Sequence, residues 1–226
     1  MSAGLALRDD DSLIIGCRGT LARFDVHSAV LTPCADLPHH HPNERTNDLC
    51  FDASGCLWVT TMHVGGEQPL GRLLRLGRDG EWMTILEGAP VLNGPAFDAT
   101  GTVGYVCDTT RRCVLRFPVP AVESTTCAAP EPFITLAETD GFPDGITVDA
   151  TGNVWLAHYA GGRVTCFAAD GTVRQVLTMP VRNVTSVAIG AGALYVTTAH
   201  DPSDGKRVPG GTLFTVPIEG LEPARP

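Results

Sequence analysis

Three short polar segments of this sequence could do chemistry, and each is followed by an apolar stretch. They are Arg45-Thr46-Asn47-Asp48, Leu92-Asn93-Gly94-Pro95 and Gly141-Phe142-Pro143-Asp144-Gly145. Asn and Asp side chains offer the oxygen ligands that hard cations such as Ca²⁺, Mg²⁺ or Mn²⁺ prefer, and Asp144 could also act as a base. Arg45 and Asn47 could hold an oxygen-rich substrate. Asn-Gly and Asp-Gly are also ordinary turn pairs, so it is the repetition of the pattern that favours a site.

A sequence repeat must position these segments. The unit Phe51-Asp52-Ala53-Ser54-Gly55-Cys56-Leu57-Trp58-Val59 recurs at residues 97–106 and 148–156, and weaker copies occur at 8–15 and 189–196. Each copy predicts a strand, a tight turn and a second strand, because Asp begins turns and Gly takes the positive-φ position. The clear copies are spaced by about 45 to 50 residues, which is the period of a propeller blade.

Two more strands are predicted after the first and third clear copies, at residues 72–76 and 82–86 and at 162–167 and 173–177. Four strands per repeat predict an all-β fold, a β-propeller of four-stranded blades. We expect one domain over residues 1–226 with five units, which begin near Leu5, Asn47, Asn93, Gly145 and Thr185. The last unit has three clear strands. In a propeller, the polar segments of successive blades converge at one mouth of the central channel.

Composition excludes several functional classes. The net charge is −9 with 16 Lys and Arg, and no basic run occurs, which argues against a nucleic-acid partner. No signal peptide and no apolar stretch of about 20 residues is visible, so we expect no membrane partner and a cytoplasmic location. The eight cysteines form no Cys-x-x-Cys pair and are expected to be free thiols. Serine-hydrolase, phosphate-loop and dinucleotide motifs are absent from the sequence.

Taken together, the motifs resemble one known family. Arg45-x-Asn47-Asp48, Asn93-Gly94 and Pro143-Asp144-Gly145, with the surrounding repeats from about Gly4 to Glu219, are similar to the senescence-marker-protein/gluconolactonase (regucalcin-like) family. The resemblance implies a six-bladed propeller that binds one divalent cation (Ca²⁺, or Zn²⁺, Mn²⁺ or Mg²⁺) and opens sugar lactones. It implies that Asn93 and Asp144 are metal ligands, that Arg45 and Asn47 contact substrate, and that Glu67 is a further substrate-facing residue.

The sequence also departs from the family pattern. A third metal ligand of the family, a Glu in a Glu-Gly-Pro-x-Trp motif of the first blade, has no counterpart here. We therefore expect a chain that lacks the first blade and is N-terminally truncated relative to the family. Leu49, Leu92 and Pro95 stand where Gly, Ser and Leu are usual. Loss of one charged ligand should weaken a hard-cation site. A fragment, a five-bladed variant and a chain that has lost activity all remain open.

Two functions of different classes follow. The first is divalent-metal-dependent hydrolysis of a sugar lactone to the aldonic acid, with Asp144 as the catalytic base. The second is a non-catalytic calcium-binding or interaction propeller, or an inactive truncated homologue. The acidic charge and the missing Glu favour the second function, whereas retention of Arg45, Asn47, Asn93 and Asp144 favours the first. An unclosed propeller edge would also promote self-association.

Overall fold

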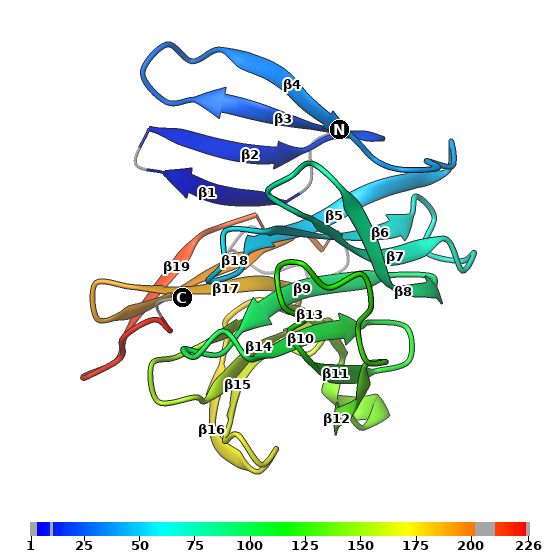
Figure 1. Cartoon of the computed structure of the whole chain (residues 1–226). Helices are drawn as coiled ribbons and strands as arrows, with labels where there is room; N and C mark the ends of the chain where they lie inside the picture. The colour runs from blue at the N-terminus through cyan, green and yellow to red at the C-terminus, as the bar shows by residue number, and fades with distance from the viewer. Residues whose placement is uncertain (1–3, 10, 202–210, 225–226) are drawn as a thin grey trace.

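Five antiparallel sheets surround a central axis in the computed structural model, which describes residues 4–9, 11–201 and 211–224 (Figure 1). The first sheet contains β1 (Leu5–Asp9), β2 (Ser12–Gly16), β3 (Thr20–Asp25) and β4 (Leu31–Asp36). The second contains β5 (Glu44–Phe51), β6 (Leu57–His63), β7 (Gly71–Leu76) and β8 (Trp82–Ala89). The third contains β9 (Leu92–Phe97), β10 (Val103–Asp108), β11 (Cys113–Pro118) and β12 (Glu131–Thr135).

The chain continues in the same way through the last two sheets. The fourth contains β13 (Phe142–Val148), β14 (Val154–Tyr159), β15 (Arg163–Phe167) and β16 (Val173–Thr178). The fifth has three described strands, β17 (Val184–Gly190), β18 (Ala193–Thr198) and β19 (Phe214–Pro217). A 3₁₀ turn, η1 (Glu138–Asp140), precedes β13. We call these sheets blades A to E. They confirm the predicted all-β propeller of five units.

The predicted turns form as expected, and the reason is local. One oxygen of Asp52 accepts the backbone N–H groups of Ser54 (2.9 Å) and Cys56 (3.0 Å), and its other oxygen accepts Nε1–H of Trp58 (2.7 Å). Blade D repeats this arrangement around Asp149, from the turn at Thr151 and Asn153 to the Trp155 indole. One carboxylate thus closes the turn and fixes the aromatic ring beside it.

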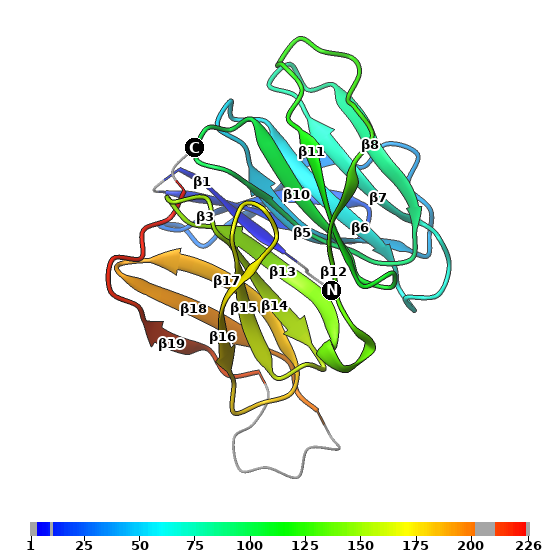
Figure 2. The same ribbon diagram turned by 90° about the horizontal axis from the view of Figure 1, so that it is seen from below.

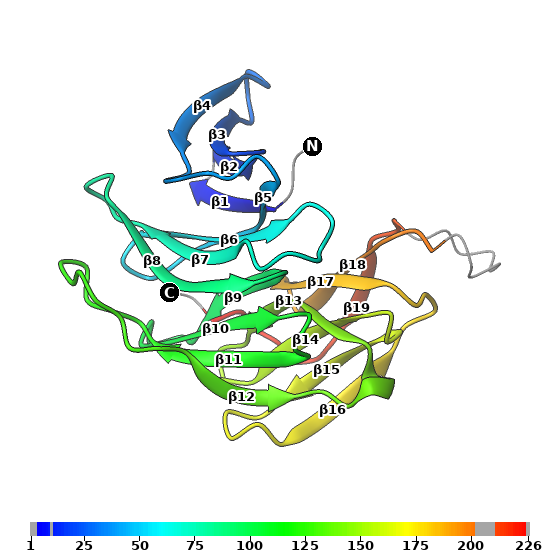
Figure 3. The ribbon, with the colours of Figure 1, turned by 90° about the vertical axis from the view of Figure 1, so that its right-hand side faces the viewer.

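Four clusters of buried apolar side chains fill the junctions between consecutive blades. Between blades B and C, for example, Trp58 packs against Phe97 and Phe117 with ring centroids 5.3 Å away. The inner strands β1, β5, β9, β13 and β17 then follow one another around the axis, as the views in Figures 2 and 3 show. Burial of these faces between blades, rather than within one sheet, holds the ring together.

Two further predictions concern the cysteines and the membrane. All eight cysteines are free, as expected. Among the described residues, no helix has the length and apolar character needed to cross a membrane.

Candidate functional site

The polar residues Arg45, Asn47, Asn93 and Asp144 lie inside the inner strands β5, β9 and β13 and not ahead of them. Strand pairing is interrupted between Thr46 and Leu49 in β5, between Asn93 and Ala96 in β9, and between Pro143 and Ile146 in β13. Each interruption is a β-bulge, in which extra residues oppose fewer partners and side chains are re-aimed. The Asn-Gly and Asp-Gly pairs are therefore strand bulges and not turns. The physical reason is that a bulge releases backbone groups from the ladder without ending the strand.

Glycine is required at two of these bulges because neighbouring blades come very close. A Cβ atom on Gly94, which has φ +79°, would lie 2.8 Å from Cγ2 of Ile146 in blade D. A Cβ atom on Gly145 would lie 2.2 Å from Oγ of Ser186 in blade E. The glycine after Asn93 and the glycine after Asp144 thus let three inner strands converge.

Side chains of blade B satisfy the backbone groups that the bulge in β9 releases. The Asp48 carboxylate accepts the N–H of Gly94 at 3.1 Å. The hydroxyl of Thr60 donates to the Gly94 carbonyl oxygen at 3.0 Å and accepts the N–H of Asp48 at 3.0 Å. Every one of these groups is paired, so blades B and C are clamped together directly beside Asn93.

Arg45, Asn47 and Asn93 form one chain of hydrogen bonds. Nη1 of Arg45 donates to Oδ1 of Asn47 at 3.0 Å. Nδ2 of Asn47 donates to the Leu92 carbonyl oxygen at 2.8 Å and to Oδ1 of Asn93. Three of the residues predicted from sequence, drawn from two blades, are therefore in direct contact.

The chain of hydrogen bonds continues into blade D, toward Asp144. Nδ2 of Asn93 donates to the hydroxyl of Thr109 at 2.8 Å, and that hydroxyl donates to the carbonyl oxygen of Pro143 at 2.8 Å. Pro143 immediately precedes Asp144 in β13. The structure thus brings the two predicted metal ligands to neighbouring inner strands, joined through one hydroxyl.

Asp48, Asp144 and Arg45 lie close enough for their charges to affect one another. Burial raises the pKa of Asp144 well above its usual range and the Asp48 carboxylate raises it further, whereas the Gly145 N–H and Arg45 lower it. Burial likewise raises the pKa of Asp48 to about 6, against the lowering effects of the Gly94 N–H and Arg45. Two half-buried carboxyl groups lie near one guanidinium, and desolvation and mutual repulsion disfavour both being charged at once.

This donor set fits a hard divalent cation. Asn93 is 6% exposed, and its amide oxygen accepts a hydrogen bond from Asn47. Asp144 supplies a carboxylate whose charged form is disfavoured by burial unless a positive partner is present. No group of three or more His, Cys, Asp or Glu suited to a metal occurs among the described residues. The assignment of Asn93 and Asp144 as ligands of such an ion stays a prediction from the sequence.

Glu67 lies apart from these residues. It is exposed in the segment between β6 and β7, and its backbone N–H donates to Nδ1 of His63 at 3.2 Å. Among the described residues, no hydrogen bond or ion pair links Glu67 to Arg45 or Asn47, and its substrate role stays a prediction. Two contributors had no role assigned from sequence. Asp48 belongs to a recognisable motif, whereas Thr109 carries no sequence signal at all.

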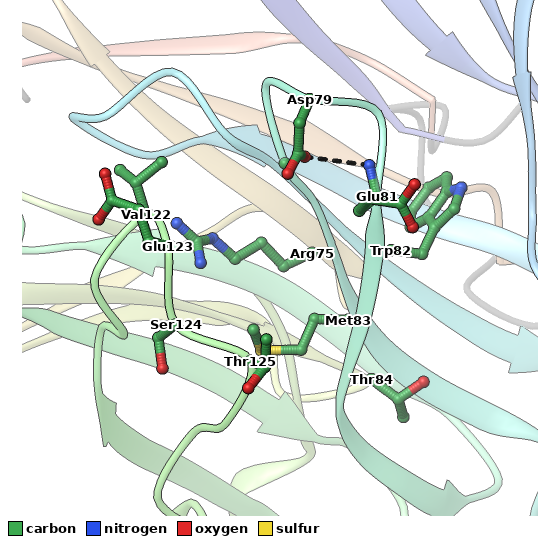
Figure 4. A pocket seen from close by; sticks show the side chains of 11 residues that line it. Arg75, Asp79, Glu81, Trp82, Met83, Thr84, Val122, Glu123, Ser124 and Thr125 are labelled. Atoms are coloured by element: carbon green, nitrogen blue, oxygen red, sulfur yellow. Dashed lines mark hydrogen bonds between the residues drawn. The ribbon is translucent and has the colours of Figure 1, made fainter.

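A cavity of about 640 Å³ lies in the channel below these residues. It is lined mainly by apolar groups of all five blades, together with Asp48. A separate cavity of about 450 Å³ lies between the β7–β8 hairpin and the loop at residues 122–125 (Figure 4). There Arg75, only 2% exposed, donates to the Ala121 carbonyl oxygen at 3.1 Å and so ties that loop to blade B.

Known proteins share both the sequence and the fold. The family model described as SMP-30/Gluconolactonase/LRE-like region matches residues 1–200. Pentonolactonase XacC of Haloferax volcanii is 37% identical over 90% of this chain and 69% of its own length. L-arabinolactonase of Azospirillum brasilense is 33% identical over 88% of this chain and 67% of its own length. The chain thus spans about two thirds of the length of these relatives.

Solved structures agree. A calcium-binding protein, regucalcin, from Agrobacterium tumefaciens superposes with a TM-score of 0.88 and 28% identity, over 99% of this chain and 77% of that one. The extent of the family match and the identity to the relatives are decisive. This chain belongs to the SMP-30/gluconolactonase/LRE-like family.

Proposed function

We propose that this chain hydrolyses a sugar lactone to the aldonic acid with the help of one divalent cation, as a cytoplasmic enzyme. The observation that carries the proposal is the connected cluster at the channel. Arg45, Asn47 and Asn93 form one hydrogen-bonded chain, and Thr109 ties it to the strand of Asp144. Relatives named pentonolactonase and L-arabinolactonase support the substrate class.

Each residue has a chemical task in this proposal. Asn93 and Asp144 would hold the cation, which when bound supplies positive charge to polarise a carbonyl oxygen. Asp144 is also the candidate base, which takes a proton from the attacking water. Arg45 and Asn47 orient the substrate oxygens through N–H donors.

Asp48 supports the same chemistry indirectly. Its carboxylate fixes the Gly94 amide and stands close enough to Asp144 to raise the pKa of that carboxyl.

The test is hydrolysis of δ-gluconolactone and of L-arabinonolactone in a pH-stat, with and without a chelator. Asp144→Ala should lower kcat/KM by about 10³-fold, since it removes both a ligand and a base. Asp79→Ala, an exposed turn residue of blade B, is the matched control and should leave the rate unchanged.

Full activity of Asp144→Ala would contradict the assigned role. Chelator-insensitive hydrolysis would contradict the metal dependence. Cation binding without hydrolysis in folded protein would favour the non-catalytic calcium-binding propeller, the reading that the likeness to a calcium-binding protein supports.

A further inference from the structure

Arg45, Asn47, Asn93, Thr109 and the Pro143 carbonyl oxygen form one chain of hydrogen bonds, which we call the relay. Thr109 is the member that joins the strands of the two predicted cation ligands. It follows β10, and its hydroxyl accepts a hydrogen bond from Nδ2 of Asn93 and donates one to the Pro143 carbonyl oxygen, both at 2.8 Å. A hydroxyl has one proton to donate. Both hydrogen bonds of the Thr109 side chain are thus committed to neighbouring inner strands.

The direction of these hydrogen bonds is determined by chemistry. A carbonyl oxygen only accepts, so the Thr109 proton must point to Pro143. The Asn93 atom that faces Thr109 must therefore be the amide nitrogen, which donates. Its oxygen then faces away from Thr109, toward Asn47. The orientation of the Asn93 amide follows from this requirement and not from an arbitrary choice between two similar atoms.

The other end of the relay imposes the same direction. The Arg45 guanidinium only donates, and the Leu92 carbonyl oxygen only accepts. Asn47 must therefore turn its oxygen to Arg45 and its nitrogen to Leu92 and Asn93. The relay has a donor-only group at one end and an acceptor-only group at the other, so both amides between them have one allowed orientation.

We propose that Thr109 is a positioning residue of the cation site. Its hydroxyl holds the Asn93 amide so that the oxygen, which accepts one hydrogen bond from Asn47, keeps a second lone pair for a ligand. It also ties the amide to the backbone that carries Asp144. This inference rests on the proposed function, because the cation is what the Asn93 oxygen would bind. Without the hydroxyl, the amide can rotate and present its N–H₂ group, which repels a cation. Asn47 still favours the native orientation, so the effect is intermediate.

The test compares Thr109→Val, which is similar in shape but lacks the hydroxyl, with Thr109→Ser, which keeps it. Thr110→Val, at the exposed neighbouring position, is the matched control. Mn²⁺ affinity is measured by electron paramagnetic resonance of the free ion, alongside kcat and KM for lactone hydrolysis. Thr109→Val should weaken Mn²⁺ binding about tenfold, as loss of groups that orient metal ligands does. Thr109→Ser should stay within about threefold of the wild type, as expected where the hydrogen bond is retained, and Thr110→Val should bind unchanged.

Wild-type Mn²⁺ affinity in folded Thr109→Val would overturn the inference. Equal losses of Mn²⁺ affinity in the Val and Ser variants would overturn it too. Such a result would mean that the affinity does not depend on whether the hydroxyl is present. Urea midpoints of all three variants establish that the folded state is being compared.

A second measurement needs neither cation nor substrate. The side-chain N–H₂ signals of Asn93, assigned by their loss in Asn93→Asp, report its hydrogen bonds through exchange with solvent. Exchange should be slow in the wild type and in Thr109→Ser, and about tenfold faster in Thr109→Val, the factor that about 1.4 kcal/mol of lost hydrogen bonding represents. If the wild type neither binds Mn²⁺ nor hydrolyses lactone, the proposed function fails, while the exchange rates alone uphold or overturn the positioning role. Unchanged exchange in Thr109→Val overturns it.

Discussion

The arc formed by β5, β9 and β13 differs from the opening between the first and last blades, where β1 and β17 lie. Within the arc, side chains reach across blade junctions: Asn47 to Leu92, Asp48 and Thr60 to Gly94, and Thr109 to Pro143. At the opening, no hydrogen bond joins the described strands of blade A to those of blade E. The channel cavity instead extends from Leu5 of β1 to Val187 of β17.

The two regions also differ in what they expose. Leu5 and Leu7 of β1 are 62% and 63% exposed, whereas Asn93 in the arc is 6% exposed. An apolar contact tolerates small shifts, but a hydrogen bond requires a defined distance and angle. The comparison shows that the candidate site residues lie on the side of the ring where hydrogen bonds fix their placement. The opening has exposed apolar side chains, and self-association there stays a prediction.

The largest effect should come from the ion pair that anchors the start of β5. Arg72 donates to both carboxylate oxygens of buried Glu44, at 2.8 and 2.9 Å. Arg72→Ala leaves that carboxylate buried without its cation and should cost about 3–5 kcal/mol of unfolding free energy. Urea unfolding gives the value. Arg116→Ala, which breaks the exposed pair with Glu131, should cost less than about 1 kcal/mol. Equal losses would show that the arc is no better held than the periphery.

The second prediction concerns how the free energy of unfolding depends on pH. Burial lowers the pKa of His158 in blade D to about 4; the hydrogen bond to the Asp140 carbonyl oxygen and the Asp140 carboxylate raise it, and Arg163 lowers it. Because the unfolded histidine has a pKa near 6.5, it binds a proton between about pH 6.5 and 4 that the folded one does not. Stability should therefore fall through this window as pH is lowered, by up to about 3 kcal/mol from this group.

Variants isolate that contribution. His158→Gln should flatten the fall in unfolding free energy between pH 6.5 and 4, measured by urea titration at several pH values. His27→Gln, at an exposed position of blade A, should keep the wild-type slope. An unchanged slope in His158→Gln would mean that the imidazole is protonated in the folded state.

The smallest effect tests the comparison most directly. Thr60→Val removes the hydroxyl that pairs the Gly94 carbonyl and the Asp48 N–H, and should cost about 2 kcal/mol. Thr197→Val, at an exposed position of β18 beside the opening, removes a hydroxyl that pairs with Thr185 and should cost less than about 0.5 kcal/mol. Thermal and urea unfolding of the two variants give the change in unfolding free energy for each. Similar values would remove the distinction between arc and opening.

Most of the fold could be predicted from the sequence because its determinants are local. Asp52 and Asp149 close their turns with backbone groups two and four residues away, and Gly55 and Gly152 adopt the positive φ that such turns need. The number of blades followed from the spacing of these turns. The bulges were not predicted, because a bulge depends on how a strand pairs with its neighbour, and Asn-Gly has the same letters in a turn and in a bulge.

The sequence by itself determined which residue types stand at equivalent points of three blades, and hence the candidates Arg45, Asn47, Asn93 and Asp144. Only the tertiary structure decided that these residues meet, that Asp48 raises the pKa of Asp144, and that Thr109 orients Asn93. Those relations join residues about 16 to 100 positions apart in the chain. They arise when apolar burial closes the blades around the axis, which sets the distance and direction between polar groups that no local pattern encodes.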